Sequence, residues 1–156
     1  MRIRKFTKGD EPVLWDLFYN TIHRVNINDY TQEQLDAWAP ANLDPALWQN
    51  KIQTIKPFVV EHNGEIVGYA DLQDDGFIDH FYCHHAWQRQ GIGSMLMKKI
   101  HEEAKASGVL QLYSNVSVTA KPFFVAQGFE VAKEHSISIR GQELLSFRMQ
   151  KHLKHS

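Results

Sequence analysis

The most informative residues of this chain are Gln88-Arg89-Gln90-Gly91-Ile92-Gly93. They follow an apolar run, residues 77–83, and lead into a helical pattern. Glycine lets the backbone come close to a ligand. The first turn of a helix has N–H groups without partners and a dipole that favours negative charge. The segment therefore predicts a phosphate-binding loop between a strand and a helix, with a tight turn that binds nothing as the alternative.

Length and composition are those of an ordinary globular protein. The chain has 156 residues, of which 43% are hydrophobic and 22% charged, so we expect one domain over residues 1–156. No stretch is long and apolar enough to cross a bilayer, and the N-terminus lacks the apolar segment of a signal peptide. The single cysteine, Cys83, fits a reducing compartment. These features predict a cytoplasmic protein with no membrane partner.

Charge is distributed unevenly along the chain. Residues 1–87 carry 7 Lys/Arg and 13 Asp/Glu, a net of −6, and residues 88–156 carry 10 Lys/Arg and 5 Asp/Glu, a net of +5. A basic half could attract a polyanionic cofactor and an acidic half a cationic substrate, although the same charges could simply solvate the surface. A pI near 6.7 without a dense basic run argues against nucleic acid as a partner.

Periodicity and turn signals predict the order of the elements. A short strand at 3–6 precedes a helix at 10–24, a second helix with a Thr31/Gln34 capping box, and a third that begins near Pro45. Asn63-Gly64 predicts a hairpin, which is followed by a strand at 77–83, a helix at 91–106, a strand at 109–116 and a helix at 120–127. A short strand at 129–132 and a terminal hairpin of strands at 136–139 and 144–149 complete the predicted order. The fold class is α/β (α+β), with a mixed central sheet of about seven strands and helices on both faces.

Two motifs in this order resemble the GNAT superfamily of acetyl-CoA-dependent N-acetyltransferases. They are residues 78–96 (IDHFYCHHAWQRQGIGSML) and residues 120–129 (AKPFFVAQGF), the second similar to the family pattern Ala-x-x-Phe-Tyr-x-x-x-Gly-Phe. The resemblance covers nearly the whole chain. It implies a splayed strand pair around the cofactor and direct transfer of an acetyl group to a primary amine of a small molecule or peptide.

The resemblance also implies a cofactor site. In the family, backbone N–H groups of the loop and of the first helical turn hold the pyrophosphate, and a strand edge pairs with the pantetheine arm as in β-augmentation. Carried over to this sequence, the expected acetyl-CoA-binding residues are Phe81, Tyr82, Cys83, Gln88, Arg89, Gln90, Gly91, Ile92, Gly93, Ser94, Ser117 and Phe124.

Other cofactor classes fit the sequence poorly. The segment Gly91-x-Gly93 lacks the third glycine and the early βαβ unit of a dinucleotide fold, and it lacks the Gly-Lys-Ser/Thr of a Walker loop. His80, His84 and His85 have no metal-ligating partners at a recognisable spacing, so we expect no metal.

A base must remove a proton before an ammonium can attack a thioester. Asp79 is the first candidate, because a carboxylate inside an apolar strand is costly unless it is paired or functional. His80 is the second, and a structural role stays open for both. The backbone N–H near Phe81 or Tyr82 is where the family stabilises the developing oxyanion.

The sequence departs from the family pattern at the position of the general acid. Phe124 stands where the family usually has a tyrosine, and Ser117 where many members have an asparagine. A phenyl group cannot donate a proton, so water or the substrate ammonium could protonate the thiolate. We expect Tyr30 and Trp38 to bind the acceptor, with a core role as the alternative.

Two further hypotheses stand beside the N-acetyltransferase. Phe124 supports a non-catalytic acyl-CoA-binding module that senses or regulates. The other hypothesis is a structural subunit whose sheet edge serves as a dimer interface. The terminal hairpin makes a homodimer possible.

Overall fold

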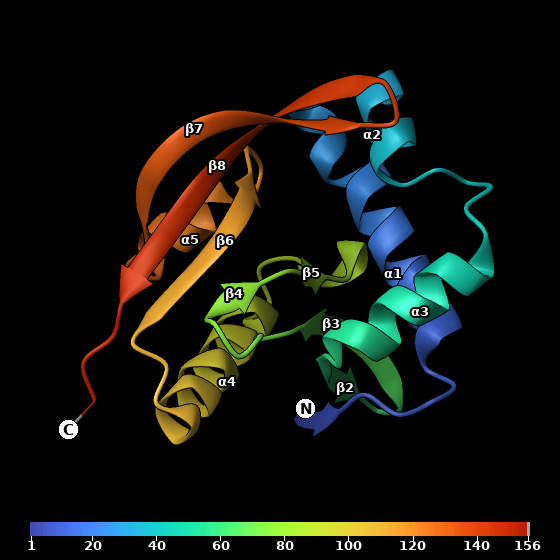
Figure 1. Ribbon diagram of the computed structural model, residues 1–156. Coiled ribbons are helices and arrows are strands. Elements are labelled where there is room, and N and C mark those ends of the chain that lie inside the picture. Colours follow the sequence, from blue (N-terminus) through green and yellow to red (C-terminus); the bar gives the residue numbers. More distant parts are fainter. Residues whose placement is uncertain (156) are drawn as a thin grey trace.

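The computed structural model describes residues 1–155, which form eight strands, five α-helices and two short 3₁₀ helices (Figure 1). The strands are β1 (Arg2–Lys5), β2 (Phe58–His62), β3 (Glu65–Ala70), β4 (Phe77–Ile78), β5 (Phe81–Cys83), β6 (Gln111–Ser117), β7 (Glu130–Ile139) and β8 (Gln142–His152). The helices are α1 (Glu11–Arg24), η1 (Asn26–Asn28), α2 (Gln32–Trp38), α3 (Pro45–Ile55), η2 (His85–Trp87), α4 (Ile92–Ser107) and α5 (Lys121–Ala126).

Hydrogen bonding divides the expected central sheet into two sheets of four strands. One has the order β1-β2-β3-β5 and the other β4-β6-β8-β7. All of their pairings are antiparallel except that of β4 with β6, which is parallel. Figure 1 shows the two sheets diverging, with β5 at the edge that faces β6. The predicted mixed α/β fold with a splayed strand pair is confirmed.

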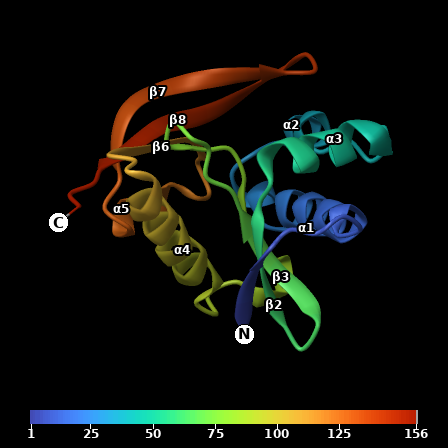
Figure 2. The same ribbon diagram turned by 60° about the horizontal axis from the view of Figure 1, so that its bottom comes forward.

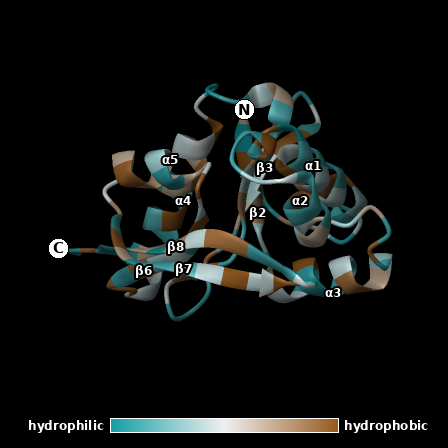
Figure 3. Ribbon diagram, turned by 90° about the horizontal axis from the view of Figure 1, so that it is seen from above, coloured by the Kyte–Doolittle hydropathy of each residue, from teal (hydrophilic) through white to brown (hydrophobic). Residues whose placement is uncertain are grey.

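Helices cover both faces of the first sheet, with α4 on one side and α1 and α3 on the other (Figure 2). Strand alternation explains this arrangement. In β2, Val60 belongs to the core cluster that contains Leu96 of α4, and the adjacent Val59 belongs to the cluster that contains Leu14 of α1. Most helices carry both hydrophilic and hydrophobic segments, as amphipathic helices do (Figure 3).

Three short sequence motifs adopt the local structures that they predict. The Thr31 side chain accepts a hydrogen bond from the Gln34 N–H, and the Gln34 side chain accepts one from the Thr31 N–H, which completes the capping box. Asn63 and Gly64 both have positive φ, 51° and 80°, as a two-residue hairpin turn requires. Gly108 ends α4 in the left-handed conformation.

Two strand predictions were wrong in detail. Residues 77–83 are not one strand, because β4 pairs with β6 and β5 pairs with β3, and Asp79 and His80 between them belong to neither strand. The two short strands expected near 129–132 and 136–139 are instead one long strand, β7, with a register shift between Val131 and Lys133. No helix within residues 1–155 combines the length and apolar character needed to cross a membrane.

Candidate active site

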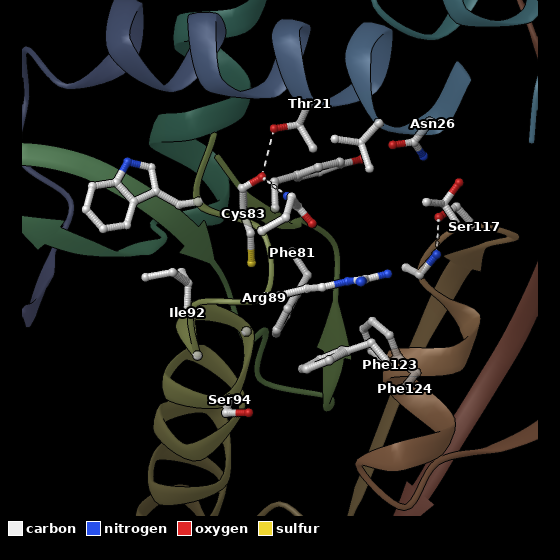
Figure 4. Close-up of a pocket in the computed structure, with 18 residues that line it drawn as sticks. Thr21, Asn26, Phe81, Cys83, Arg89, Ile92, Ser94, Ser117, Phe123 and Phe124 are labelled. Atoms are coloured by element: carbon white, nitrogen blue, oxygen red, sulfur yellow. Dashed lines mark hydrogen bonds between the residues drawn. The ribbon is translucent and has the colours of Figure 1, made fainter. Parts of the chain in front are cut away.

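A cavity of about 400 Å³ lies where β5 diverges from β6, and it reaches the start of α4 and the end of α1 (Figure 4). Of the twelve residues expected to bind the cofactor, all except the exposed Gln90 line this cavity. In Figure 4, Ser94 lies at one end of the cavity, while Asn26 and Ser117 lie at the other. The lining of the cavity thus joins the glycine loop to the opening between the two sheets.

The end near Ser94 has a backbone geometry that suits an anion. Gly91 is the N-cap of α4, a helix of 16 residues, and it takes a left-handed φ of 82°. The N–H groups of the first helical turn have no partners within the helix, and the helix dipole adds positive potential there. Arg89 also has a left-handed φ, 61°, which is uncommon for a residue other than glycine. Its guanidinium extends into the cavity (Figure 4).

Gly93 permits a close contact on the other side of the loop. A Cβ atom there would lie 2.9 Å from the Cε1 atom of Phe123 in α5. The glycine therefore lets the first turn of α4 pack directly against α5. Both residues line the cavity, so this contact forms part of its wall.

Within residues 1–155, strand β5 has one edge without a strand partner. The Asp71 N–H donates to the His80 carbonyl and the His84 N–H donates to the Val67 carbonyl, which fixes the pattern of the ladder between β3 and β5. In an antiparallel ladder with this pattern, the N–H and C=O groups of Phe81 and Cys83 point away from β3. They face the gap between the sheets, where an extended chain could pair with them.

Two side chains already occupy the carbonyl of Cys83. Thr21 Oγ1 of α1 donates to it over 2.9 Å, and Gln88 Nε2 donates to it over 2.9 Å (Figure 4). The backbone groups that remain for a ligand are therefore the N–H of Cys83 and both groups of Phe81. Thr21 and Gln88 also tie the end of β5 to α1 and to the glycine loop.

Aromatic rings form the wall beneath β5. The ring centroids of Phe81 and Phe124 lie 5.4 Å apart, and those of Phe81 and Phe123 lie 5.5 Å apart. Phe124 is buried and offers no proton donor. Ser117 Oγ accepts a hydrogen bond from the Ala120 N–H, so its hydroxyl caps the turn before α5.

The two candidate bases lie at the crossing between β4 and β5, outside the lining of the cavity. The Asp79 carboxylate forms an ion pair with Lys51 of α3, with 2.5 Å between Nζ and Oδ2. His80 is buried among the rings of Phe18, Trp48, Tyr69 and Tyr82. Burial lowers the pKa of His80 to about 4, so the imidazole is neutral at pH 7.

The residues expected to bind the acceptor also lie outside the lining. The Tyr30 hydroxyl accepts from the Val118 N–H over 2.8 Å and donates to the Leu145 carbonyl over 2.7 Å. Trp38 packs edge-on against Tyr30 at 5.5 Å. Tyr30 therefore joins the α1–α2 region to the second sheet, and its hydroxyl has already donated its proton to a protein partner.

Cys83 and Tyr82 are the other titratable groups beside Arg89 in the lining. Burial raises the pKa of Cys83 to about 12, so the thiol stays protonated and is a poor nucleophile at pH 7. Burial also raises the pKa of Tyr82 well above its ordinary value.

Sequence reasoning missed the polar residues that line the end of the cavity farthest from Ser94. They are Thr21 and Asn26 from α1 and η1, and Thr119 from the turn after β6. Thr119 Oγ1 donates to Asp29 over 2.7 Å, which places a carboxylate next to this end. Nothing local in the sequence marks these residues, because they come together only through the fold.

Comparisons with known proteins agree with this geometry. Residues 26–153 match the model of the family described as Acetyltransferase (GNAT) domain. The chain belongs to the GNAT acetyltransferase family. It is therefore an acyltransferase, and family membership favours an enzyme over the non-catalytic binding module.

Individual relatives resemble this GNAT protein over nearly its whole length. It is 27% identical over 149 residues to the uncharacterized N-acetyltransferase YafP of Escherichia coli (strain K12), covering 96% of this chain and 94% of that protein. A GCN5-related N-acetyltransferase from Rhodopseudomonas palustris, titled an aminotransferase of class II, superposes with a TM-score of 0.93 at 28% identity, over 97% of this chain and 95% of that one. YncA of Salmonella typhimurium, a putative acetyltransferase solved with acetyl-CoA, superposes with a TM-score of 0.71 at 20% identity, over 100% and 95% of the two chains.

The described residues also bear on metal binding. Among residues 1–155, no group of three or more His, Cys, Asp or Glu side chains is placed to hold a metal ion.

Proposed function

We propose that residues 1–156 act as a single domain that transfers the acetyl group of acetyl-CoA directly to a primary amine of a small molecule or peptide. The observation that carries the proposal is the cavity that joins the free edge of β5 to the start of α4. Support comes from family membership and from acetyl-CoA in the YncA structure. A cytoplasmic location is part of the proposal, supported by the free thiol of Cys83.

The glycine loop would bind the diphosphate of acetyl-CoA. The N–H groups of Ile92, Gly93 and Ser94 lie in the first turn of α4 and can donate to phosphate oxygens. Arg89 adds a charge-assisted hydrogen bond, which is roughly twice as strong as a neutral one. Gln88 acts through the Cys83 carbonyl and keeps the loop joined to β5.

The free edge of β5 would bind the pantetheine arm as a short added strand. Phe81 and Cys83 supply the hydrogen-bonding groups, and Ser117 and Phe124 form the opposite wall. Near the thioester, the Phe81 N–H would donate to the carbonyl oxygen as negative charge develops on it. Tyr82 lines the same end of the cavity.

The acceptor amine would enter at the end of the cavity lined by Thr21, Asn26 and Thr119. These side chains are polar and uncharged, and the nearby Asp29 favours a cation at the rim. The amine must lose a proton before attack, and Asp79 and His80 stay the proposed bases. Because neither side chain lines the cavity, either would act through water.

The leaving thiolate needs no acid from this chain. A thiolate is a fairly good leaving group, so water or the ammonium formed on attack can supply the proton. This is consistent with a phenyl ring at Phe124, which can shape the wall of the cavity but cannot donate.

The test is a thiol-release assay with acetyl-CoA against a panel of polyamines, aminoglycosides, amino acids and peptide N-termini. The proposal predicts release of CoA with at least one class, together with heat of CoA binding in calorimetry. Binding of CoA with no turnover on any amine would contradict acetyl transfer. Gel filtration of the same sample tests the possible homodimer, for which the edge strand β7 is the proposed interface.

A further inference from the structure

The chain crosses from one sheet to the other at Asp79 and His80, between β4 and β5 (Figure 1). β4 pairs with β6, whereas β5 pairs with β3. A continuous strand would give the N–H groups of these two residues partners in a ladder. At a crossing the partners must come from elsewhere, because a buried N–H without a partner costs free energy.

The Asp71 carboxylate supplies these partners. Its Oδ1 accepts from the His80 N–H over 2.6 Å and from the Asp79 N–H over 3.1 Å. Its Oδ2 accepts from Gln73 Nε2 over 2.7 Å, and the same amide also donates to the Ile55 carbonyl at the end of α3. Asp71 has no exposed surface. Burying a carboxylate without hydrogen-bond donors would cost much free energy, so the N–H donors around Asp71 are what allows it to be buried here.

Asp71 also holds the other side of the His80 peptide. The Asp71 N–H donates to the His80 carbonyl over 3.3 Å. That carbonyl and the Phe81 N–H belong to one planar trans peptide group, in which they point in opposite directions. By holding the carbonyl toward β3, Asp71 directs the Phe81 N–H into the gap between the sheets.

We propose that the Asp71 carboxylate is a positioning residue for acetyl transfer: it fixes the crossing so that the Phe81 N–H points at the thioester oxygen. This inference rests on the proposed function. Asp71 itself lies outside the lining of the cavity, so it acts only through the backbone.

The charge state of Asp71 gives the inference a distinct signature. Burial raises the pKa of Asp71 to about 6. The titratable groups that face it are Asp79 and His80 at the crossing, Tyr69 of β3, Tyr82 of β5 and, through its ion pair with Asp79, Lys51 of α3. Of these groups, Asp79 and Lys51 form an ion pair with each other. Protonation would turn one acceptor oxygen of Asp71 into a donor that faces N–H groups.

The test compares kcat of the wild type with that of Asp71→Asn at saturating acetyl-CoA, from about pH 5 to about pH 8. Asparagine has the shape of a protonated aspartate, with one acceptor and one donor group. We expect kcat of the variant to be about tenfold lower near pH 8. Since protonated Asp71 resembles Asn, we expect the ratio of the two kcat values to approach one below about pH 6. Ionisation of the amine cancels in this ratio.

Asp74→Asn is the matched control, because it removes an exposed carboxylate three positions away. Its kcat should follow that of the wild type at every pH. A ratio for Asp71→Asn that stays near one at pH 8, or that is large but independent of pH, would overturn the inference. The second result would show a merely structural role.

A second variant tests the inference if Asp71→Asn does not fold. Gln73→Ala removes the donor to Oδ2 and leaves the carboxylate in place. We expect its kcat to fall about threefold with an unchanged affinity for CoA, and an unchanged kcat would overturn the inference. If the wild type binds CoA and turns over, a negative result with these variants concerns Asp71 alone. If the wild type binds no CoA in calorimetry, the proposed function fails and this inference fails with it.

Discussion

The two ends of the cavity are built in different ways. The end that holds the start of α4 comes from one continuous segment, residues 88–94. The opposite end combines Thr21, Asn26, Tyr82 and Thr119, which come from three separate parts of the chain: the α1–η1 segment, β5 and the turn after β6. A continuous segment keeps its geometry through local backbone conformation, whereas an assembled end depends on contacts between distant elements. Substitutions at the two ends should therefore affect different properties: CoA affinity at the start of α4 and stability near the opposite end.

The largest effect is expected for Gly91→Val. Gly91 has a φ of 82° and open space around its Cβ position, so the penalty comes from the backbone and not from a clash. A β-branched residue rarely takes this conformation, so the start of α4 must rearrange and its N–H groups turn away from the diphosphate. We expect the affinity for CoA to fall about a hundredfold or more in calorimetry.

Gly141→Val is the control for this variant. Gly141 also has a φ of 82° and open space, but it lies in the turn between β7 and β8. The same strain should lower stability there without a comparable loss of CoA binding. Equal losses of affinity in the two variants would contradict a special role for the glycine loop.

A smaller effect is expected for Arg89→Ala. Alanine leaves the loop backbone as it is and removes only the guanidinium that extends into the cavity. We expect the dissociation constant of CoA to rise about tenfold, because one charge-assisted hydrogen bond is lost. Binding should also depend less steeply on salt. Lys98→Ala, which removes an exposed positive charge from α4, should leave both quantities unchanged; the same change in Lys98→Ala would assign the effect to net charge.

Next to the assembled end, outside the lining of the cavity, Tyr30→Phe should act on stability and not on binding. It removes the hydroxyl that joins the Val118 N–H to the Leu145 carbonyl. We expect the free energy of unfolding to fall by about 1 kcal/mol in denaturant titrations, because a partly buried N–H loses its partner. CoA affinity and the KM of the amine should stay within about twofold.

Tyr19→Phe serves as the control, because it removes a phenolic hydroxyl from α1 at a partly buried position. Unchanged stability in Tyr30→Phe together with a raised KM for the amine would instead support the acceptor-binding role that the sequence suggested. The two outcomes separate a structural joint from a substrate contact.

The smallest effect is expected for Phe124→Tyr. It restores the hydroxyl that family members usually carry at this position. Because the thiolate leaves without help from an acid, we expect kcat to change by less than about threefold. A rise of about tenfold or more would show that protonation of the thiolate limits the rate in the natural chain.

The sequence predicted best what depends on neighbouring residues. The Thr31/Gln34 capping box, the Asn63-Gly64 turn and the Gly91 helix start all need residues only a few positions apart, and each forms as predicted. For the same reason, the residues of the glycine loop reach the cavity, with the exception of Gln90.

What the sequence could not predict depends on distant partners. The break in the strand at Asp79 and His80 follows from Asp71, and the alternation of residues 77–83 carries no sign of it. Tyr30 has a structural role because its hydroxyl bonds to the backbone of Val118 and Leu145, which are distant from it in the sequence. Thr21 and Asn26 read as ordinary residues near a helix end, and only the fold brings them to the cavity.

The most direct test of the central claim is a crystal structure of the protein with CoA. The account predicts diphosphate oxygens within hydrogen-bonding distance of the N–H groups of residues 92–94, and a pantetheine arm that pairs with the backbone of Phe81 and Cys83. A second cavity, of about 560 Å³, is lined by three lysines and two carboxylates, Lys5, Lys56, Lys99, Asp74 and Glu103, and is the alternative site for an anion. CoA bound in that second cavity, or a complex in which the gap between β5 and β6 is closed, would contradict the account.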